Sequence, residues 1–319
     1  MISDNVPLLK HCHGIEADQG IHPATSHIFQ VCIDRIMKVS NFRTPMLKGI
    51  VIGVVITLAF LHLSNVNSND AVQSKDTMIV VVTPTYRRSV RLPDLTRLKN
   101  TLLNIANLHW IIVEDGPSAV PAVSRMLQMS GLNYTYLQYK TKFGYPRRGW
   151  YQRDMAIEYL ENNKHTITGG QHAVLYFADD DNSYDTRLFD EYIRNVKKIG
   201  IWGVGLVGTM PVEAPAVENG VVVGWHTDWR PNRSFAVDMA GFAVSLDLVL
   251  TTKARFGTSC EKAGGSPEPC FLERLGISTD HLEPFGAEGV KKELLVWHTH
   301  TSPLKYDKRK VDLYGYIVE

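Results

Sequence analysis

The sequence predicts an α/β fold, a parallel β-sheet covered by helices on both faces, and three observations support it. Apolar runs alternate with helical patterns from residue 78 onward, the order that produces parallel sheets. The runs are continuously apolar, as expected for strands buried on both faces. Polar residues follow three of the runs directly, where ligands bind in such sheets. With 319 residues, 44% of them hydrophobic, the chain can bury a large core.

The predicted elements follow one another along the chain. The first strand lies in MIVVVTPTY, residues 78–86, and ends close to Pro84. A helix is expected to open at Pro93, because Leu95, Leu98 and Leu102 recur at helical spacing. The next elements are expected as a strand at 110–116, a helix near 120–129, a strand at 133–139, a helix at 150–163 and a strand at 173–181.

One segment is not typical of a globular domain. GIVIGVVITLAFLHL, residues 49–63, is strongly apolar, and no Asp, Glu, Lys or Arg occurs between residues 49 and 69. As a helix it would span roughly 22 Å, which suits a thin membrane. The alternatives are a buried core helix, which should show a polar face, and a cleaved signal peptide, which should not begin almost fifty residues into the chain.

Charge sets the expected orientation of this segment. Basic residues precede it and mainly acidic ones follow, so the positive-inside rule places the N-terminus in the cytosol. We therefore expect a cytosolic tail at 1–48, a signal anchor at 49–63, a stem at 64–77 and a lumenal domain at 78–319, a single-pass type II topology. Cys260 and Cys270 would lie in the lumen, where a disulfide can form, and the sequence leaves their pairing open. The net charge of +1 gives no reason to expect a nucleic-acid partner.

Three carboxylates in a row, Asp179–Asp181, follow the predicted fourth strand in LYFADDDNSYD. Adjacent carboxylates raise one another's pKa unless a cation neutralises them. Mg²⁺ or Mn²⁺ would do so and could hold a diphosphate, with Arg148 and Arg153 taking the remaining negative charge. In a plainer interpretation, one Asp caps the next helix and its neighbours are solvated. The D-x-D-x-[ST] pattern of haloacid dehalogenase-type phosphotransferases also fits, but that motif normally ends a first strand.

Several stretches of the sequence carry a resemblance to a known family. They are VTPTYRR, LPDLTRLKNTLLNIANLHWIIVEDG, FADDDNSYD, VDMAGFAVSL and LLVWHTHT. Together they resemble the β-1,3-glucuronyltransferases over residues 77–301. The resemblance implies a GT-A fold with a nucleotide-sugar-binding sheet, UDP-glucuronic acid as donor, Mn²⁺ as cofactor and inverting transfer to a terminal galactose. It also implies a Golgi membrane enzyme, typically a homodimer, that builds the proteoglycan linker Gal-Gal-Xyl or the HNK-1 epitope.

The same resemblance assigns roles to individual residues on the donor side. Asp181 would be the direct ligand of Mn²⁺, and the nucleotide would be held by strand-end segments and by two histidines near the C-terminus. The donor residues that the resemblance implies are Pro84, Thr85, Tyr86, Asp115, Arg148, Arg153, Asp179, Asp180, His298 and His300.

On the acceptor side, an inverting transfer needs one base that takes the proton of the attacking hydroxyl. The resemblance places this role on Glu268 in SPEPCFLERLG, although a first-turn Glu can also simply stabilise the helix dipole. Trp229 would offer its ring to the apolar face of the galactose. Glu213, Arg233 and Asp238 complete the implied acceptor pocket.

Some features depart from the family pattern. The family usually reads W-H-T-R-T where this chain reads WHTHT, so His300 replaces an arginine. Histidine is shorter and mostly uncharged at neutral pH, so we expect weaker donor binding or a compensating Lys or Arg. Pro267 and Pro269 beside the implied base are unusual. Sequons occur at Asn133 and Asn232, the second inside the expected acceptor pocket.

Two further hypotheses stay open. A catalytically degenerate member of the family would bind a nucleotide sugar or glycan without turnover. An enzyme of the same class could instead act on N-acetyllactosamine of glycoproteins, or use another donor sugar. The sequence does not separate these, because acceptor choice depends on loops.

Overall fold

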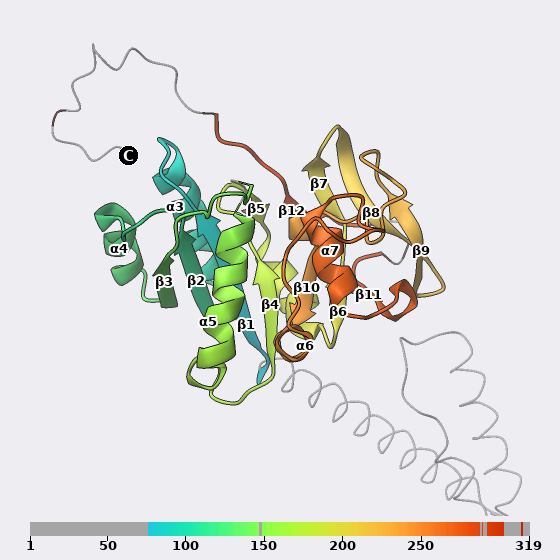
Figure 1. Ribbon diagram of the computed structural model, residues 1–319, viewed down its shortest axis with the longest axis horizontal. Coiled ribbons are helices and arrows are strands. Elements are labelled where there is room, and N and C mark those ends of the chain that lie inside the picture. Colours follow the sequence, from blue (N-terminus) through green and yellow to red (C-terminus); the bar gives the residue numbers. More distant parts are fainter. Residues whose placement is uncertain (1–75, 147–148, 288, 290–291, 303–313, 315–319) are drawn as a thin grey trace, which may run out of the picture. The chain divides into compact units, whose positions relative to one another are not determined.

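Figure 1 shows the protein as a computed structural model, which describes residues 76–146, 149–287, 289, 292–302 and 314. The expected cytosolic tail, the signal anchor, most of the stem and Arg148 lie outside these residues. Within the described part of the chain, no helix is both long and apolar enough to cross a bilayer.

The centre of the fold is a seven-stranded sheet with the order β11-β6-β10-β4-β1-β2-β3. Four neighbouring strands, β4, β1, β2 and β3, run parallel, as the alternation of strands and helices predicts. The strands of this sheet are β1 (Met78–Thr85), β2 (Leu108–Glu114), β3 (Asn133–Gln138), β4 (Ala173–Phe177), β6 (Ile199–Ile201), β10 (Phe242–Ser245) and β11 (Glu283–Pro284).

The expectation of a purely parallel sheet is wrong at one strand. β10 runs antiparallel to both β4 and β6, with Ala243 opposite Tyr176 and Gly200. The chain enters β10 at the carboxyl end of β4 and therefore has to run back along it. An antiparallel neighbour needs no crossover helix, so no βαβ pattern marks it in the sequence.

A second sheet, with the order β5-β12-β7-β8-β9, is absent from the sequence-based prediction. Two of its strands, β5 (Ser183–Tyr184) and β12 (Val296–Trp297), are only two residues long and give no periodic signal. The other strands are β7 (Val204–Val207), β8 (Met210–Glu218) and β9 (Val221–His226). β12 pairs antiparallel with β5, which brings the chain after residue 297 next to the acidic triplet.

Helices cover both faces of the large sheet, as predicted (Figure 1). Alternate residues of β1 point to opposite faces. Ile79 and Val81 pack in the core that includes α3, whereas Val80 and Val82 pack in the core that includes α5. The helices are α3 (Arg91–Leu102), α4 (Pro121–Gln128), α5 (Trp150–Thr168), α6 (Leu246–Thr252) and α7 (Pro267–Arg274), with short turns η2 (Leu188–Tyr192), η3 (Ile193–Asn195), η4 (Met239–Gly241) and η5 (Thr279–His281).

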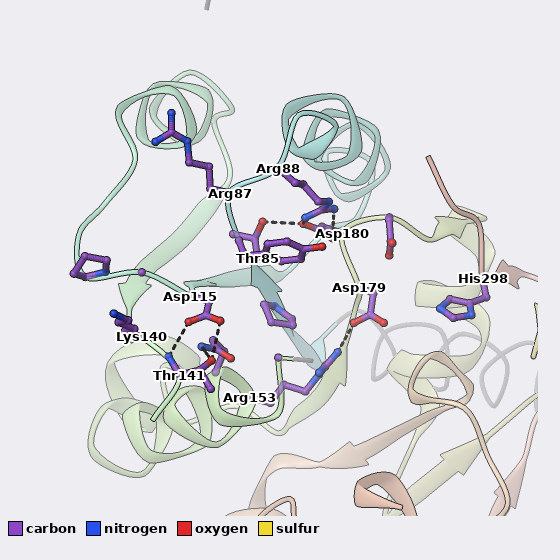
Figure 2. A pocket seen from close by; sticks show the side chains of 17 residues that line it. Thr85, Arg87, Arg88, Asp115, Lys140, Thr141, Arg153, Asp179, Asp180 and His298 are labelled. Atoms are coloured by element: carbon purple, nitrogen blue, oxygen red, sulfur yellow. Dashed lines mark hydrogen bonds and ion pairs between the residues drawn. The ribbon is translucent and has the colours of Figure 1, made fainter. Parts of the chain in front are cut away.

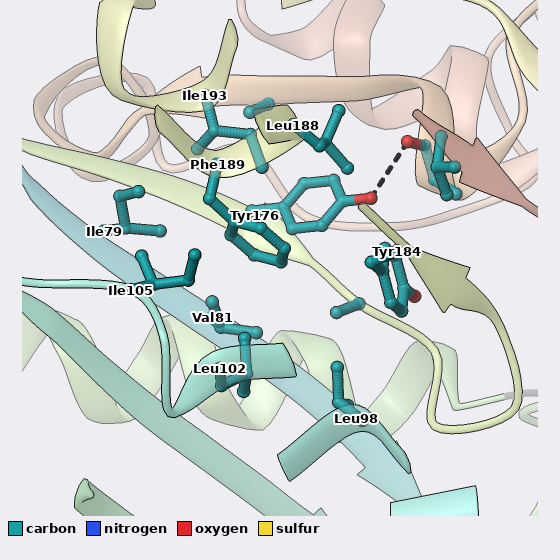
Figure 3. Close-up of a cluster of buried hydrophobic side chains, with 14 of the residues drawn as sticks. Ile79, Val81, Leu98, Leu102, Ile105, Tyr176, Tyr184, Leu188, Phe189 and Ile193 are labelled. Carbon is teal, nitrogen blue, oxygen red and sulfur yellow. Dashed lines mark hydrogen bonds between the residues drawn. The ribbon is translucent and has the colours of Figure 1, made fainter. Parts of the chain in front are cut away.

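The face around α3 also carries the aromatic cluster of Figure 3. Tyr176 of β4 meets Tyr184 and Phe189 edge-on, with ring centroids 6.1 and 5.9 Å apart. The Tyr176 hydroxyl donates to the main-chain oxygen of Ala240 at 3.0 Å, which satisfies a polar group that is buried completely. This cluster fixes β5, and with it the segment that follows the acidic triplet, against the sheet.

The parallel strands end side by side, as the sequence predicts. Asp115 N donates to Thr85 O at 2.8 Å and Ala178 N donates to Val82 O at 3.0 Å, so the pairing continues past the ends of β2 and β4. The residues directly after three strands are therefore neighbours at one edge of the sheet.

Candidate active site

A pocket of about 650 Å³ opens where β1, β2 and β4 end (Figure 2). Its walls come from these three strand ends, from the first turn of α5, from the loop after β3 and from the segment after β12. The lining residues are Pro84, Thr85, Tyr86, Arg87, Arg88, Asp115, Gly116, Pro117, Lys140, Thr141, Gly149, Gln152, Arg153, Asp179, Asp180, Asp181 and His298.

Asp180 is the buried member of the acidic triplet. Arg88 donates to both of its oxygens, from Nη1 to Oδ2 at 2.9 Å and from Nη2 to Oδ1 at 2.7 Å, and Thr85 Oγ1 donates to Oδ2 at 2.8 Å. Burial raises the pKa of Asp180, while Arg88 and Thr85 hold it down. Arg88 also donates to Asp94 at 2.9 Å, so this arginine ties the end of β1, α3 and the triplet together.

Asp179 forms an ion pair with Arg153 in the first turn of α5 (Figure 2). Gly149 precedes this helix with φ 76°, a conformation that favours glycine. A Cβ atom at position 149 would lie 2.7 Å from Cγ of Pro84 and 2.9 Å from Nη1 of Arg153. The glycine therefore permits the close approach that brings Arg153 to the triplet.

Asp181 differs from its two neighbours because no arginine among the described residues forms an ion pair with its carboxylate. Its side chain is 31% exposed, and His300 Nδ1 lies 3.8 Å from Oδ2. Burial raises the pKa of Asp181 and the charge of Asp179 raises it further, while the charges of Arg88 and His298 oppose this rise. Its main-chain oxygen accepts from Arg97 Nη2 and from Thr299 Oγ1, both at 2.7 Å.

These contacts fit a divalent cation at Asp181. A cation there would compensate the carboxylate whose charge is least neutralised in the triplet. Among the described residues, no group of three His, Cys, Asp or Glu side chains is placed to hold a metal by itself. A cation at Asp181 would therefore take its other ligands from a bound phosphate and from water, as Mg²⁺ and Mn²⁺ commonly do.

Asp115 lies at the opposite wall of the pocket (Figure 2). It accepts from Thr141 N at 2.7 Å and from Thr141 Oγ1 at 2.8 Å. Gln152, fully buried, donates to Thr141 Oγ1 at 3.0 Å and to Tyr139 O at 2.9 Å. The loop after β3 is thus fixed against both β2 and α5.

The segment after β12 supplies His298 from the other side of the triplet. His298 N donates to Gly205 O at 2.8 Å, and Thr301 Oγ1 donates to Asp94 Oδ1 at 2.6 Å. The ring of His300 lies 4.9 Å from that of His298, but the His300 side chain is 70% exposed and does not line the pocket. Of the two predicted histidines, the structure therefore places His298 in the pocket and His300 at its rim beside Asp181.

Glu268 lies in the first turn of α7, where the sequence predicts it. Proline is tolerated in this turn because the first N–H groups of a helix have no intrahelical partner, which accounts for Pro267 and Pro269. Burial raises the pKa of Glu268 to about 7, with a further rise from Asp238 and an opposing effect of Arg153. Charges of the donor pocket and of the predicted acceptor residues therefore both affect the pKa of this carboxyl group.

The predicted acceptor residues form a second group. Thr227 Oγ1 donates to Glu213 Oε1 at 2.6 Å, and Arg233 Nη2 lies 3.9 Å from Glu213 Oε2. The Arg233 guanidinium lies over the Trp229 ring at 4.7 Å from its centroid, and Trp229 remains 51% exposed. An exposed indole held in place by a buried guanidinium is suited to stack on a sugar ring.

Asp238 links this group to Glu268. Its carboxylate accepts from Ala240 N at 2.9 Å and begins η4, and burial raises its pKa. Burial lowers the pKa of Arg233, and the charges of Glu213, Glu268 and Asp238 oppose this effect. The four acceptor residues and the predicted base thus share one local electrostatic environment.

Most of the predicted donor residues meet in one pocket. Arg148 lies outside the described residues, and His300 stays at the rim. The sequence reasoning missed Arg88, Thr141 and Gln152 as partners of the strand-end carboxylates. Arg88 had a signal, because it lies three residues after the end of β1. The pairing of Thr141 with Asp115 depends on a loop conformation that the sequence does not reveal.

Comparisons with known proteins identify the family of the chain. The chain matches glycosyltransferase family 43 over residues 98–302. It is 43% identical over 234 residues to human galactosylgalactosylxylosylprotein 3-beta-glucuronosyltransferase 1, covering 70% of this chain and 69% of the relative. It is also 43% identical over 227 residues to human galactosylgalactosylxylosylprotein 3-beta-glucuronosyltransferase 2, with the same coverage.

A distant structural likeness was found as well. The crystal structure of S. aureus TarS 1-349 in complex with UDP-GlcNAc superimposes with a TM-score of 0.43 and 12% sequence identity. The match covers 72% of this chain and 60% of that chain, and it is too remote to support a functional conclusion.

Proposed function

Because the chain belongs to glycosyltransferase family 43, we propose that it is a β-1,3-glucuronosyltransferase that moves glucuronate from UDP-glucuronate to the 3-hydroxyl of a terminal galactose. The proposed acceptor is the linker Gal-Gal-Xyl on protein, which matches the names of both human relatives. The observation that carries the proposal is the place of Glu268 in the first turn of α7, where charges of the donor pocket, Arg153 and Asp179, and of Asp238 all act on its carboxyl.

Glu268 would act as the general base. It takes the proton from the acceptor 3-hydroxyl while that oxygen attacks the anomeric carbon and the bond to the UDP oxygen breaks, which inverts the configuration. A base works best with a pKa near the operating pH, and burial brings the pKa of Glu268 to about 7. A Glu that only stabilised the helix dipole would gain nothing from such burial.

The strand-end residues would hold the donor. Pro84, Thr85, Tyr86 and Asp115 would bind the nucleoside, while Arg153 and His298 would face the diphosphate. Asp179 and Asp180 would serve the nucleoside in this proposal. Asp180 would do so while bound by Arg88 and Thr85, which fix its position before a ligand arrives.

Asp181 would be the protein ligand of Mn²⁺, because its carboxylate is the least compensated of the triplet. When bound, the ion would neutralise charge on the diphosphate leaving group. Arg97 and Thr299 hold the main chain of Asp181 and so keep its carboxylate aimed at the pocket.

On the acceptor side, Trp229 would stack on the galactose, with Glu213, Arg233 and Asp238 binding its hydroxyl groups. The buried position of Arg233 makes this side of the site rigid, which favours one orientation of the acceptor.

We further propose that residues 49–63 anchor the protein in the Golgi membrane, with the described domain in the lumen, and that the enzyme works as a homodimer. The apolar run and the charge asymmetry around it support the anchor. The disulfide between Cys260 and Cys270 is consistent with an oxidising compartment.

An acceptor panel tests the proposed function. The lumenal domain is incubated with UDP-glucuronate and Mn²⁺ and given Gal-Gal-Xyl, N-acetyllactosamine or no acceptor. Transfer to Gal-Gal-Xyl supports the proposal, and preferred transfer to N-acetyllactosamine would reassign the acceptor to glycoprotein glycans. UDP binding without transfer to either acceptor would instead indicate a degenerate member of the family.

A further inference from the structure

Cys260 and Cys270 form a disulfide, a pairing that the sequence leaves open. The loop that this bond closes contributes to both the acceptor side and the catalytic turn. Lys262 O accepts from Ser234 N at 2.9 Å, and Gly264 O accepts from Arg230 Nη1, so the loop supports the segment that carries Trp229 and Arg233.

The first turn of α7 is buried but is closed by few main-chain hydrogen bonds. Pro267 and Pro269 have no N–H group, and the turn is closed by a hydrogen bond of 3.3 Å from Cys270 N to Ser266 O. Cys270 is fully buried, so the disulfide fixes the end of the very turn in which Glu268 lies.

The rest of α7 is attached independently of the disulfide. Phe271 stacks on Phe256 with ring centroids 4.6 Å apart, and Leu272 is fully buried. Arg274 Nη1 donates to Arg255 O at 2.9 Å. Loss of the disulfide should therefore loosen the loop and the first turn while the helix stays packed on the sheet.

We propose that the Cys260–Cys270 disulfide is a positioning element of the reaction. It holds Glu268 in the correct position relative to the acceptor-binding segment, which carries Trp229 and Arg233. This inference rests on the proposed function, since it takes Glu268 as the base. Neither cysteine touches the reacting atoms. Their effect passes through the turn that presents the carboxylate, and misplacement of a catalytic group by about 1 Å can lower the rate on the order of a hundredfold.

The pH dependence of kcat reports on the surroundings of Glu268. It should change if the disulfide positions this carboxyl, and stay the same if the disulfide only stabilises the fold. Four charged groups act on its carboxyl from elements packed around it: Asp238 at the start of η4, Asp179 after β4, Arg153 on α5 and Arg233 in the acceptor-binding segment. If the turn loosens, the carboxyl becomes more solvated. The rise of kcat with pH should then move to lower pH, while the plateau value of kcat falls.

The experiment compares the wild type with the double variant Cys260→Ser/Cys270→Ala, both as the full chain. We expect kcat to fall on the order of tenfold and the donor KM to change less than about twofold, because donor residues lie outside the loop. A dithiol should reproduce the loss in the wild type, cleaving the S–S bond to two thiols while the dithiol is oxidised to its cyclic disulfide. Cys12 and Cys32 remain in the double variant, so a dithiol effect through them would appear there.

Tyr136→Phe is the matched control for stability. It removes a partly buried hydrogen bond to Glu114, 2.6 Å long, in a part of the fold away from the disulfide loop. A selective loss of kcat with a shifted pH profile in the double variant, absent from Tyr136→Phe, supports the inference. Unchanged kcat and pH profile, or losses of kcat, UDP affinity and melting temperature that parallel the control, overturn it. A wild type that transfers glucuronate to no acceptor would instead refute the proposed function.

Discussion

Arg88, in the turn after β1, binds both carboxylate oxygens of Asp180, at 2.9 and 2.7 Å. The two residues are 92 positions apart in the chain, and their contact joins the segments that follow β1 and β4. The fixed fork of a guanidinium suits this bidentate contact better than an ammonium group does. The acidic triplet is thus shaped by an arginine before any ligand binds.

The first prediction concerns this pair. Arg88→Lys keeps the charge and loses the fork, so Asp180 should be held less firmly and UDP affinity should fall by about tenfold, with the fold retained. Calorimetric titration with UDP and Mn²⁺ measures the effect. Arg125→Lys, on α4 outside the pocket, is the control. Equal affinities in both variants would contradict the role assigned to Arg88.

A second prediction follows from the ionisation of Glu268. Only the carboxylate can accept a proton, so kcat should rise with pH and level off above the pKa, which burial places at about 7. Initial rates at saturating donor and acceptor between pH 5 and 8.5 test this expectation. A profile that is flat over this range would show that Glu268 does not limit the reaction as a base.

His300 provides a third prediction, because it lies beside Asp181 where the family usually has an arginine. His300→Arg should bind UDP more tightly at neutral pH, since arginine is permanently charged and reaches further. Donor affinity measured with Mn²⁺ at pH 7.5 is the appropriate test. No gain in affinity would indicate that another cation, such as Arg87 or Lys140 of the pocket wall, already compensates the diphosphate.

Asp154 leads to a fourth prediction, about stability. Burial raises its pKa to about 6, while Oδ1 accepts from Phe256 N at 2.9 Å. The Asp154 carboxyl therefore binds its proton more tightly in the folded state than in the unfolded state. The stability that this proton binding contributes is lost as pH rises from about 4 to 6. An Asn at position 154 keeps an oxygen that can accept this hydrogen bond, and its side chain does not titrate.

The stability of Asp154→Asn relative to wild type should thus grow over this pH range, by about 2–3 kcal/mol in total. Urea unfolding at pH 4.5 and 7.5 compares the two proteins. A stability difference that is independent of pH would show that Asp154 has an ordinary pKa in the fold.

A fifth prediction concerns the buried ion pair behind the site. Arg91 Nη1 lies 2.6 Å from Glu114 Oε1, and both side chains are buried. Glu114→Gln should lower the free energy of unfolding by about 3–5 kcal/mol, because it removes the buried negative charge that Arg91 faces. Tyr136→Phe, which removes one neutral donor, should lower it by only about 1 kcal/mol. Chemical denaturation of the two variants tests this order, and a reversed order would contradict it.

Much of the donor half of the fold could be predicted from sequence. The strands and helices between residues 78 and 181 follow a strong βαβ pattern, and β1, β3 and α4 lie close to their expected bounds. β4 ends earlier than expected, at Phe177, and α5 continues to Thr168. α3 begins at Arg91 rather than at Pro93, because proline is tolerated throughout the first turn of a helix. Placement of the carboxylates at the strand ends followed from the topology of parallel sheets alone.

The acceptor half could not be predicted in the same way. β5 and β12 are too short to show periodicity, and β10 joins the sheet antiparallel after a long excursion. The contacts that shape the site here are non-local, such as Thr299 with Asp181 and Arg233 with Glu213. Such pairs depend on tertiary packing and leave no mark in local sequence. Glu213 and Arg233 were therefore found only through the family resemblance, and Thr299 was not predicted.

The central claim is that Glu268 deprotonates the acceptor beside a UDP-sugar held by the acidic triplet. The most direct test measures glucuronate transfer and UDP binding for wild type and Glu268→Gln side by side. We predict that the variant binds UDP with Mn²⁺ as the wild type does but transfers about 10²- to 10⁴-fold more slowly. A variant that retains wild-type turnover with UDP binding intact would contradict the account.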